Sequence, residues 1–76
     1  MISKEIRKKL GLPKKKKIYH YGLNNVPTEV EDIEILEEYK TWYLIKIKLI
    51  TGLNVVMHND FLKEMNKANY RRNIYE

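Results

Sequence analysis

The stretch of sequence that decides the fold spans residues 33–58 and reads IEILEEYKTWYLIKIKLITGLNVVMH. From Tyr43 to Leu49, one face of the chain is apolar and the other carries Lys46 and Lys48, a period of two that is typical of a half-buried strand. The β-branched and aromatic residues of this run also suit a pleated surface. Together with the shorter runs on either side, the pattern predicts a three-stranded antiparallel β-meander at about residues 32–38, 42–49 and 53–58.

The loop before the third strand sets how the last two strands pair. If residues 50–52 form a three-residue loop, Gly52 takes the left-handed position of a type I turn with a bulge. Ile47 then lies opposite Val55, and Ile45 lies opposite Met57. A two-residue loop would set apolar residues against polar ones, so the three-residue loop is the prediction.

The same reasoning predicts a three-residue loop at residues 39–41 between the first two strands. This loop sets isoleucines against isoleucines on the inner face and opposite charges against each other on the outer face, and both arrangements are favourable. The predicted pairs are Ile33 with Ile47 and Ile35 with Ile45 inside, and Glu34 with Lys46 and Asp32 with Lys48 outside.

Helices are predicted before and after the meander. Ser3 suits a helix N-cap and Gly11 suits the position after a helix end, so residues 4–10 are predicted to be helical. Asn59 or Asp60 can cap a second helix over about residues 60–72. The apolar stripe that packs this helix on the inner face of the sheet is predicted to be Phe61, Leu62, Met65 and Ala68.

The fold class that follows is α+β, in a chain of 76 residues that suits a single small domain. Residues 1–22 form a basic N-terminal arm that includes the short helix. No apolar run approaches the roughly 18 residues of a membrane span, and the first residues lack the apolar core of a signal peptide. With no cysteine in the chain, we expect a cytoplasmic protein that does not bind membranes.

Positive charge is concentrated near the N-terminus, although the net charge is only +5. The densest part is the lysine run, Lys14 to Lys17, which is followed by Tyr19 and Tyr21. Lysines neutralise phosphates, and tyrosine rings stack on bases, so this segment is a candidate nucleic-acid contact. Two alternatives remain open: a solvated charge run before a short edge strand, or internal pairing of the lysines with the acidic residues of 29–38.

The outer face of the predicted sheet carries apolar side chains among its lysines. An exposed apolar patch of this kind is typical of an interface. The alternative is that residues 18–23 fold over the patch and bury it. The predicted apolar members of this face are Leu36, Trp42, Leu44 and Val56.

The sequence shows no pattern of catalytic or metal-binding residues. A zinc site needs three or four ligands in a defined geometry, and the chain offers only His20 and His58 with no cysteine. Ser3, the only serine, is explained as a helix cap, which disfavours a Ser-His-acid triad. We interpret His58 as a strand-end residue before a helix cap. We therefore expect no enzyme activity, no cofactor and no metal.

These features predict a small non-enzymatic binding protein, of the kind that phages and mobile elements encode as accessory proteins. Its target would be a nucleic acid or a host protein that handles one, as for inhibitors of defence nucleases such as anti-CRISPR proteins. The alternatives are a stand-alone DNA- or RNA-binding protein and a protein-interaction or homodimerisation module. The residues predicted to bind are Lys8, Lys9, Lys14, Lys15, Lys16, Lys17, Tyr19, Tyr21, Trp42, Lys46, Lys48, Arg71 and Arg72.

Overall fold

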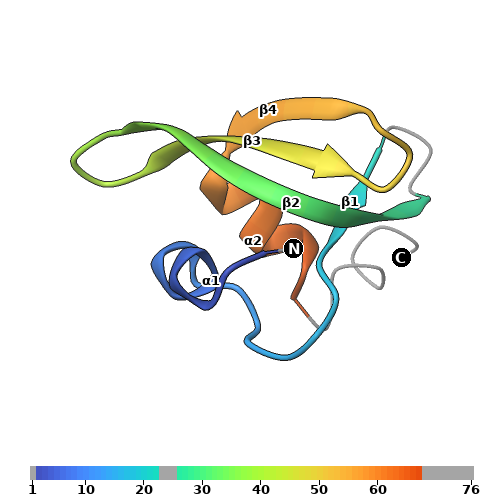
Figure 1. The fold of residues 1–76 in the computed structure, drawn as a ribbon. Coiled ribbons are helices and arrows are strands. Elements are labelled where there is room, and N and C mark those ends of the chain that lie inside the picture. The colour runs from blue at the N-terminus through green and yellow to red at the C-terminus, as the bar shows by residue number, and fades with distance from the viewer. Residues whose placement is uncertain (1, 23–25, 68–76) are drawn as a thin grey trace, which may run out of the picture.

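The computed structural model describes residues 2–22 and 26–67 of the chain. The four strands form one antiparallel sheet in the order β1-β2-β3-β4, and both helices lie on the same side of it (Figure 1). This arrangement confirms the predicted α+β class. In chain order the elements are α1 (Lys4–Leu10), β1 (Tyr19–Tyr21), β2 (Pro27–Glu38), β3 (Tyr43–Leu49), β4 (Asn54–His58) and α2 (Asn59–Met65).

The sheet has four strands rather than the predicted three. The added strand, β1, pairs with the beginning of β2, where His20 lies opposite Thr28. β2 accordingly begins at Pro27, well before the predicted start near residue 32. β1 is the short edge strand that was left open as an alternative for the segment after the lysine run, although three residues are too few to show an alternating pattern.

β1 extends the sheet sideways and does not fold over its outer face. Ile18, which precedes β1, is fully buried in the core, and Tyr19 pairs with Glu29 at the edge of β2. The alternative in which this segment covers the outer face is therefore wrong for residues 18–21.

The predicted pairing of β2 with β3 is confirmed over its central part. Ile33 lies opposite Ile47 and Ile35 lies opposite Ile45, while Glu34 faces Lys46 and Asp32 faces Lys48 on the other face. The alternation of apolar and charged residues along β2 and β3 therefore predicted the register of these two strands correctly.

The predicted pairing of β3 with β4 is also confirmed. Ile47 lies opposite Val55 and Ile45 lies opposite Met57. Gly52 has a φ of 96°, and its N–H donates to the carbonyl of Leu49 at 2.8 Å. This is the left-handed position that a three-residue loop with a bulge requires.

The loop between β2 and β3 differs from the prediction. The N–H of Tyr39 donates to the carbonyl of Trp42 at 2.8 Å, so the loop contains two residues, Lys40 and Thr41. The stacked rings of Tyr39 and Trp42 close it, with centroids 4.4 Å apart.

A β-bulge between Ile35 and Glu37 absorbs the residue that the shorter loop leaves over. The bulge moves Glu38 to the helix side of the sheet, where its carboxylate accepts a hydrogen bond from Lys9 on α1 at 3.1 Å. Glu38 thus ties the end of β2 to α1.

α1 begins and ends where the sequence predicts. The hydroxyl of Ser3 accepts a hydrogen bond from the N–H of Ile6 at 3.2 Å, and Gly11 takes a left-handed conformation with a φ of 69°. Leu10 is buried and Ile6 packs against the core. The helix therefore docks its apolar edge on the domain.

α2 begins at Asn59, and its cap is His58 rather than the predicted Asn59 or Asp60. The ring Nδ1 of His58 accepts a hydrogen bond from the N–H of Asp60 at 3.0 Å. Asn59 is instead buried, and its side-chain oxygen accepts a hydrogen bond from the N–H of Tyr43 at 2.9 Å. Phe61, predicted to lie in the core, is 62% exposed.

α2 ends at Met65, with Asn66 as its C-cap. The side-chain nitrogen of Asn66 donates to the carbonyl of Leu62 at 2.8 Å, a local bond that competes with continuation of the helix. The predicted helix is therefore wrong at residues 66 and 67, and its residues 68–72, with Ala68 in the apolar stripe, lie outside the described residues. Neither described helix is long and apolar enough to cross a membrane.

The core lies between the sheet and the two helices. Its fully buried side chains come from β3, from α2 and from the segment before β1. The N-terminal residues therefore belong to the same core as the meander. The buried apolar residues are Ile2, Leu10, Leu12, Ile18, Val30, Ile33, Ile45, Ile47, Leu49 and Leu62.

Candidate functional site

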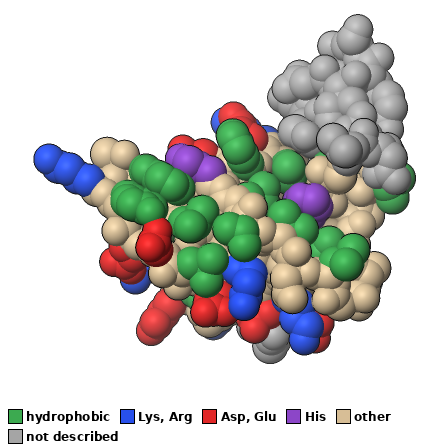
Figure 2. All heavy atoms as spheres, turned by 90° about the horizontal axis from the view of Figure 1, so that it is seen from above, with side chains coloured by type: hydrophobic (Ala, Val, Ile, Leu, Met, Phe, Trp, Pro, Cys, Tyr) green, Lys and Arg blue, Asp and Glu red, His purple; other side chains and the backbone are tan. Residues whose placement is uncertain are grey.

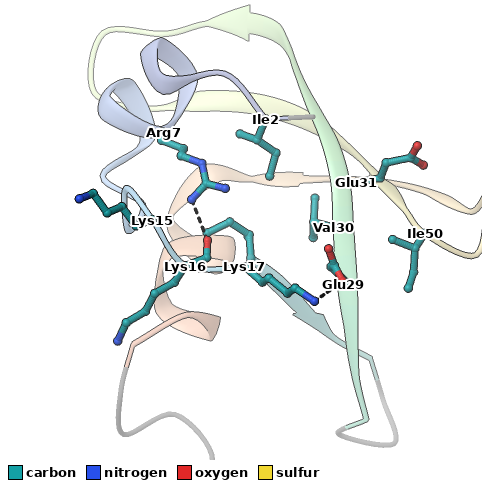
Figure 3. Close-up of a pocket in the computed structure, with 10 residues that line it drawn as sticks. Ile2, Arg7, Lys15, Lys16, Lys17, Glu29, Val30, Glu31 and Ile50 are labelled. Carbon is teal, nitrogen blue, oxygen red and sulfur yellow. Dashed lines mark hydrogen bonds and ion pairs between the residues drawn. The ribbon is translucent and has the colours of Figure 1, made fainter.

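The lysine run is part of a loop that is fixed at both ends. Leu12 before it and Ile18 after it are both buried in the core. The guanidinium of Arg7, on α1, donates to the carbonyls of Pro13 and Lys16, at 2.7 Å each. Figure 3 shows Arg7 reaching from the helix to the carbonyl of Lys16. The backbone of the run is thereby held against α1 while its side chains point outward.

A basic pocket, with a volume of about 320 Å³, opens between α1 and this loop. Two lysines one helical turn apart share a face of α1 and form one wall. The loop supplies the other wall, and no carboxylate of the described residues lines the pocket. Its lining residues are Lys4, Arg7, Lys8, Lys14 and Lys15.

A second hollow, of about 370 Å³, lies on the other side of the loop, towards β2 (Figure 3). Here the lysines meet acids: Lys17 pairs with Glu29 at 3.6 Å, and Glu31 also lines the hollow. Its floor includes the apolar side chains of Ile2 and Val30. Mixed charge makes this hollow a poorer anion site than the basic pocket.

An aromatic groove of about 360 Å³ runs from the lysine run to the end of α2. Tyr19 and Tyr21 of β1 are half-buried in it. Lys16, Lys17 and Lys67 also line this groove, together with Pro13, Met65 and Asn66. Lysines and tyrosine rings that lie close in sequence are thus brought to one continuous surface.

Ion pairs neutralise some of the predicted lysines and leave others without an acidic partner. Lys9 pairs with Glu38, and this hydrogen bond raises the pKa of Lys9 above its ordinary value. Within the lysine run, Lys17 alone pairs with an acid of residues 29–38. In the described part of the chain, the other three lysines of the run form no salt bridge. Internal pairing therefore accounts for one lysine of the run.

The outer face of the sheet carries an aromatic ladder, which consists of Tyr39, Trp42, His58 and Phe61. Trp42 stacks between Tyr39 and His58, with centroids 4.4 and 4.3 Å apart, and Phe61 tilts against His58 at 5.7 Å. Both faces of the Trp42 ring are therefore covered within the molecule. A hydrogen bond to Glu37 raises the pKa of the Tyr39 hydroxyl.

The lysines of this outer face are paired with acids. Lys46 lies 3.2 Å from Glu34, and Lys48 lies 3.9 Å from Glu31. Burial lowers the pKa of His20 below its ordinary value, which disfavours the charged form of this side chain. Figure 2 looks down on the side of the sheet away from the helices and shows hydrophobic side chains gathered there, with acidic and basic groups around them.

The structure thus divides the predicted binding residues into two groups. The lysine run, Lys8, Tyr19 and Tyr21 gather around α1 and β1, whereas Trp42, Lys46 and Lys48 lie on the outer face. Lys9 also lies on α1, but it pairs with Glu38 at the end of β2. Arg71 and Arg72 lie outside the described residues. The sequence reasoning missed Arg7, which shapes the loop, and the pocket lysine Lys4. The helical spacing of Lys4 and Lys8 was the available signal.

In the described part of the chain, no group of three or more His, Cys, Asp or Glu side chains is placed to hold a metal ion. Comparison with protein-family models, with curated proteins and with solved structures gives no match to this chain. Function is therefore inferred from the geometry and charge of the surface.

Proposed function

We propose that the protein is a non-enzymatic binding protein that holds the phosphate backbone of a nucleic acid at the basic pocket and the lysine run. The observation that carries this proposal is the all-cationic lining of the basic pocket. Unpaired cations placed side by side repel one another, and a polyanion relieves that repulsion while releasing its own counterions.

The neighbouring aromatic groove supports a nucleic acid over a simple anion. Tyr19 and Tyr21 line this groove beside the lysines, and stacking of a base on an aromatic side chain such as Tyr19 contributes about 1–3 kcal/mol. Unstacked bases reach such rings more readily than paired ones, so a single-stranded segment fits this surface best.

The outer face of the sheet fits a polyanion less well. Its two lysines, Lys46 and Lys48, already pair with carboxylates, and both faces of the Trp42 ring are covered. This comparison favours the N-terminal surface over the sheet surface for nucleic-acid contact.

The test is a titration of labelled single-stranded and duplex oligonucleotides at several salt concentrations. The site variant is Lys14→Gln/Lys15→Gln/Lys16→Gln, and the matched control is Lys40→Gln/Lys46→Gln/Lys48→Gln, which removes the same charge from the opposite side. We expect the site variant to bind more weakly, by roughly fivefold at about 0.15 M salt for each phosphate that it no longer neutralises, and to show a shallower salt dependence. Exposed lysines contribute little to stability, so both variants should fold.

If both variants bind the oligonucleotides equally weakly, net charge alone drives binding. If only the control variant binds them more weakly, the binding site lies on the outer face of the sheet. If the wild-type protein binds neither oligonucleotide, the proposal fails. Capture of a nucleic-acid-handling protein that survives nuclease treatment would then favour an inhibitor of such an enzyme.

A further inference from the structure

The two edges of the sheet are treated differently. At the β1 edge, the side-chain oxygen of Asn66 accepts a hydrogen bond from the N–H of Tyr19 at 2.8 Å, and its nitrogen donates to the Tyr19 carbonyl at 2.9 Å. The amide side chain thus satisfies both outward-facing backbone groups of Tyr19, as a neighbouring strand would. The β1 edge is therefore closed to further pairing at this residue.

At the other edge, β4 turns backbone groups away from the sheet. The N–H of Leu49 donates to the carbonyl of Leu53 at 2.8 Å. Because hydrogen-bonded and non-bonded pairs alternate in an antiparallel ladder, Val55 and Met57 also bond to β3. The N–H and C=O of Asn54 and Val56 then point away from the sheet. No element in the described ranges lies beside β4 on that side (Figure 1).

β4 also lacks the residues that protect natural edge strands. Its sequence, NVVMH, has no lysine, no acid and no proline, whereas exposed edges usually carry one of these or a bulge. Exposed apolar side chains gather on and around the strand: Leu53, Val56 and Phe61 are 65, 54 and 62% exposed.

We propose that β4 pairs antiparallel with β4 of a second copy of this chain, about a two-fold axis at Val56. This pairing sets Val56 opposite the partner's Val56, while Asn54 lies opposite the partner's His58 and Val55 opposite the partner's Met57. The strand is self-complementary in this register. None of the facing pairs brings two like charges together, and none sets an apolar residue opposite a charged one. Two four-stranded sheets become one continuous sheet.

The flanking residues support the same register. In the paired strands, Leu53 of one copy lies next to the beginning of the partner's α2, where Phe61 is exposed. A two-fold arrangement is closed, so it pairs the β4 edges of both copies with each other and leaves neither of them for further addition. A small domain with a limited core also gains stability from association.

Charge distinguishes this association from nucleic-acid binding. Each copy carries a net charge of +5, so the two copies repel one another and salt screens that repulsion. Dimerisation should therefore strengthen as salt rises, whereas binding of a polyanion weakens. The two proposals consequently fail independently.

The test is sedimentation equilibrium over a range of protein and salt concentrations. Val56→Glu is compatible with the fold, because Val56 lies opposite Lys46 on β3, but it sets two carboxylates against each other at the two-fold axis. Leu36→Glu, on the same sheet but away from the β4 edge, is the matched control. We expect dimers for the wild type and the control, and a monomer for Val56→Glu over the same range.

A charge-swap experiment tests the proposed register of the two β4 strands. Mixing the Val56→Glu variant with a Val56→Lys variant should restore the dimer as a heterodimer, since residue 56 meets residue 56 only in the proposed register. Because the chain has no cysteine, a Val56→Cys variant should also form a disulfide-linked dimer on oxidation far more readily than Leu36→Cys. A monomeric wild type at every concentration, a dimer unaffected by Val56→Glu, or equal cross-linking of the two cysteine variants would overturn the proposal.

Discussion

Gly52 holds the β3–β4 loop in a conformation that other residues rarely adopt. Its φ is 96°, and no atom lies within 4 Å of where a Cβ would stand, so a substitution there costs backbone strain and not packing. We expect Gly52→Val to lower the free energy of unfolding by more than about 1–2 kcal/mol. Urea titration measures this change.

The control for that prediction is Thr51→Val in the same loop. Thr51 is exposed, and a type I turn places this position in the right-handed region, so this variant should unfold close to the wild-type midpoint. Matching midpoints for the two variants would remove the backbone reason for this loop geometry.

Ile47 is fully buried on β3 and lies between Ile33 and Val55 in the sheet. Truncation of a buried aliphatic side chain costs about 2–5 kcal/mol. We expect Ile47→Ala to lose most of its stability at 25 °C, because a domain of this size has only about 3–5 kcal/mol to lose. Thermal unfolding followed by circular dichroism measures the loss.

Leu36→Ala, at a residue that is 39% exposed on β2, is the control for the core truncation. It should melt near the wild type. If Ile47→Ala also melts cooperatively near the wild type, the inner face of the sheet has been assigned wrongly.

Asn66 connects two elements, since its side chain bonds Tyr19 on β1 and Leu62 on α2. Asn66→Ala leaves part-buried backbone groups without partners, which costs about 1–3 kcal/mol. We expect this variant to release β1 from α2, with faster hydrogen exchange at Tyr19 than at Ile45. Asn66→Asp keeps the acceptor but loses the donor, so it should not restore the wild-type behaviour. Unchanged exchange at Tyr19 would show that β1 is held by β2 alone.

The elements that the sequence predicts well are those whose residues repeat over several positions. β3 shows its alternation directly, and the caps of α1 have residue types with strong preferences at Ser3 and Gly11. Two facing strands with consistent pairs on both faces also fix their register. These signals were sufficient for the strand order and central register of the meander and for the first helix, but not for the start of β2 or for the loop between β2 and β3.

The elements that the sequence does not predict depend on contacts between distant residues. β1, which the sequence left open only as an alternative, is held by the burial of Ile18 and by Asn66 at its edge, and neither contact leaves a local pattern. The cap at His58 replaces a more usual asparagine because Asn59 turns inward to bond Tyr43. The bulge in β2 likewise follows from the stacking of Tyr39 on Trp42, which shortens the loop.

At the scale of the whole molecule, two surfaces differ in how their positive charges are paired. Among residues 2–22 and 26–67, cations without acidic partners gather around α1 and the lysine run, while the outer face of the sheet pairs its lysines with acids. The lysine run was visible in the sequence, but the basic pocket was not, because it forms only when α1 docks and Arg7 fixes the loop.

The most direct test of the central claim is a ¹H–¹⁵N correlation spectrum recorded while a short single-stranded oligonucleotide is added. We predict that the largest amide shifts fall in residues 4–21, around the basic pocket and the aromatic groove. The strands β3 and β4 should shift little. Shifts concentrated on Tyr43–Leu49 and Asn54–His58, or a spectrum that does not change at stoichiometric oligonucleotide in low salt, would contradict it.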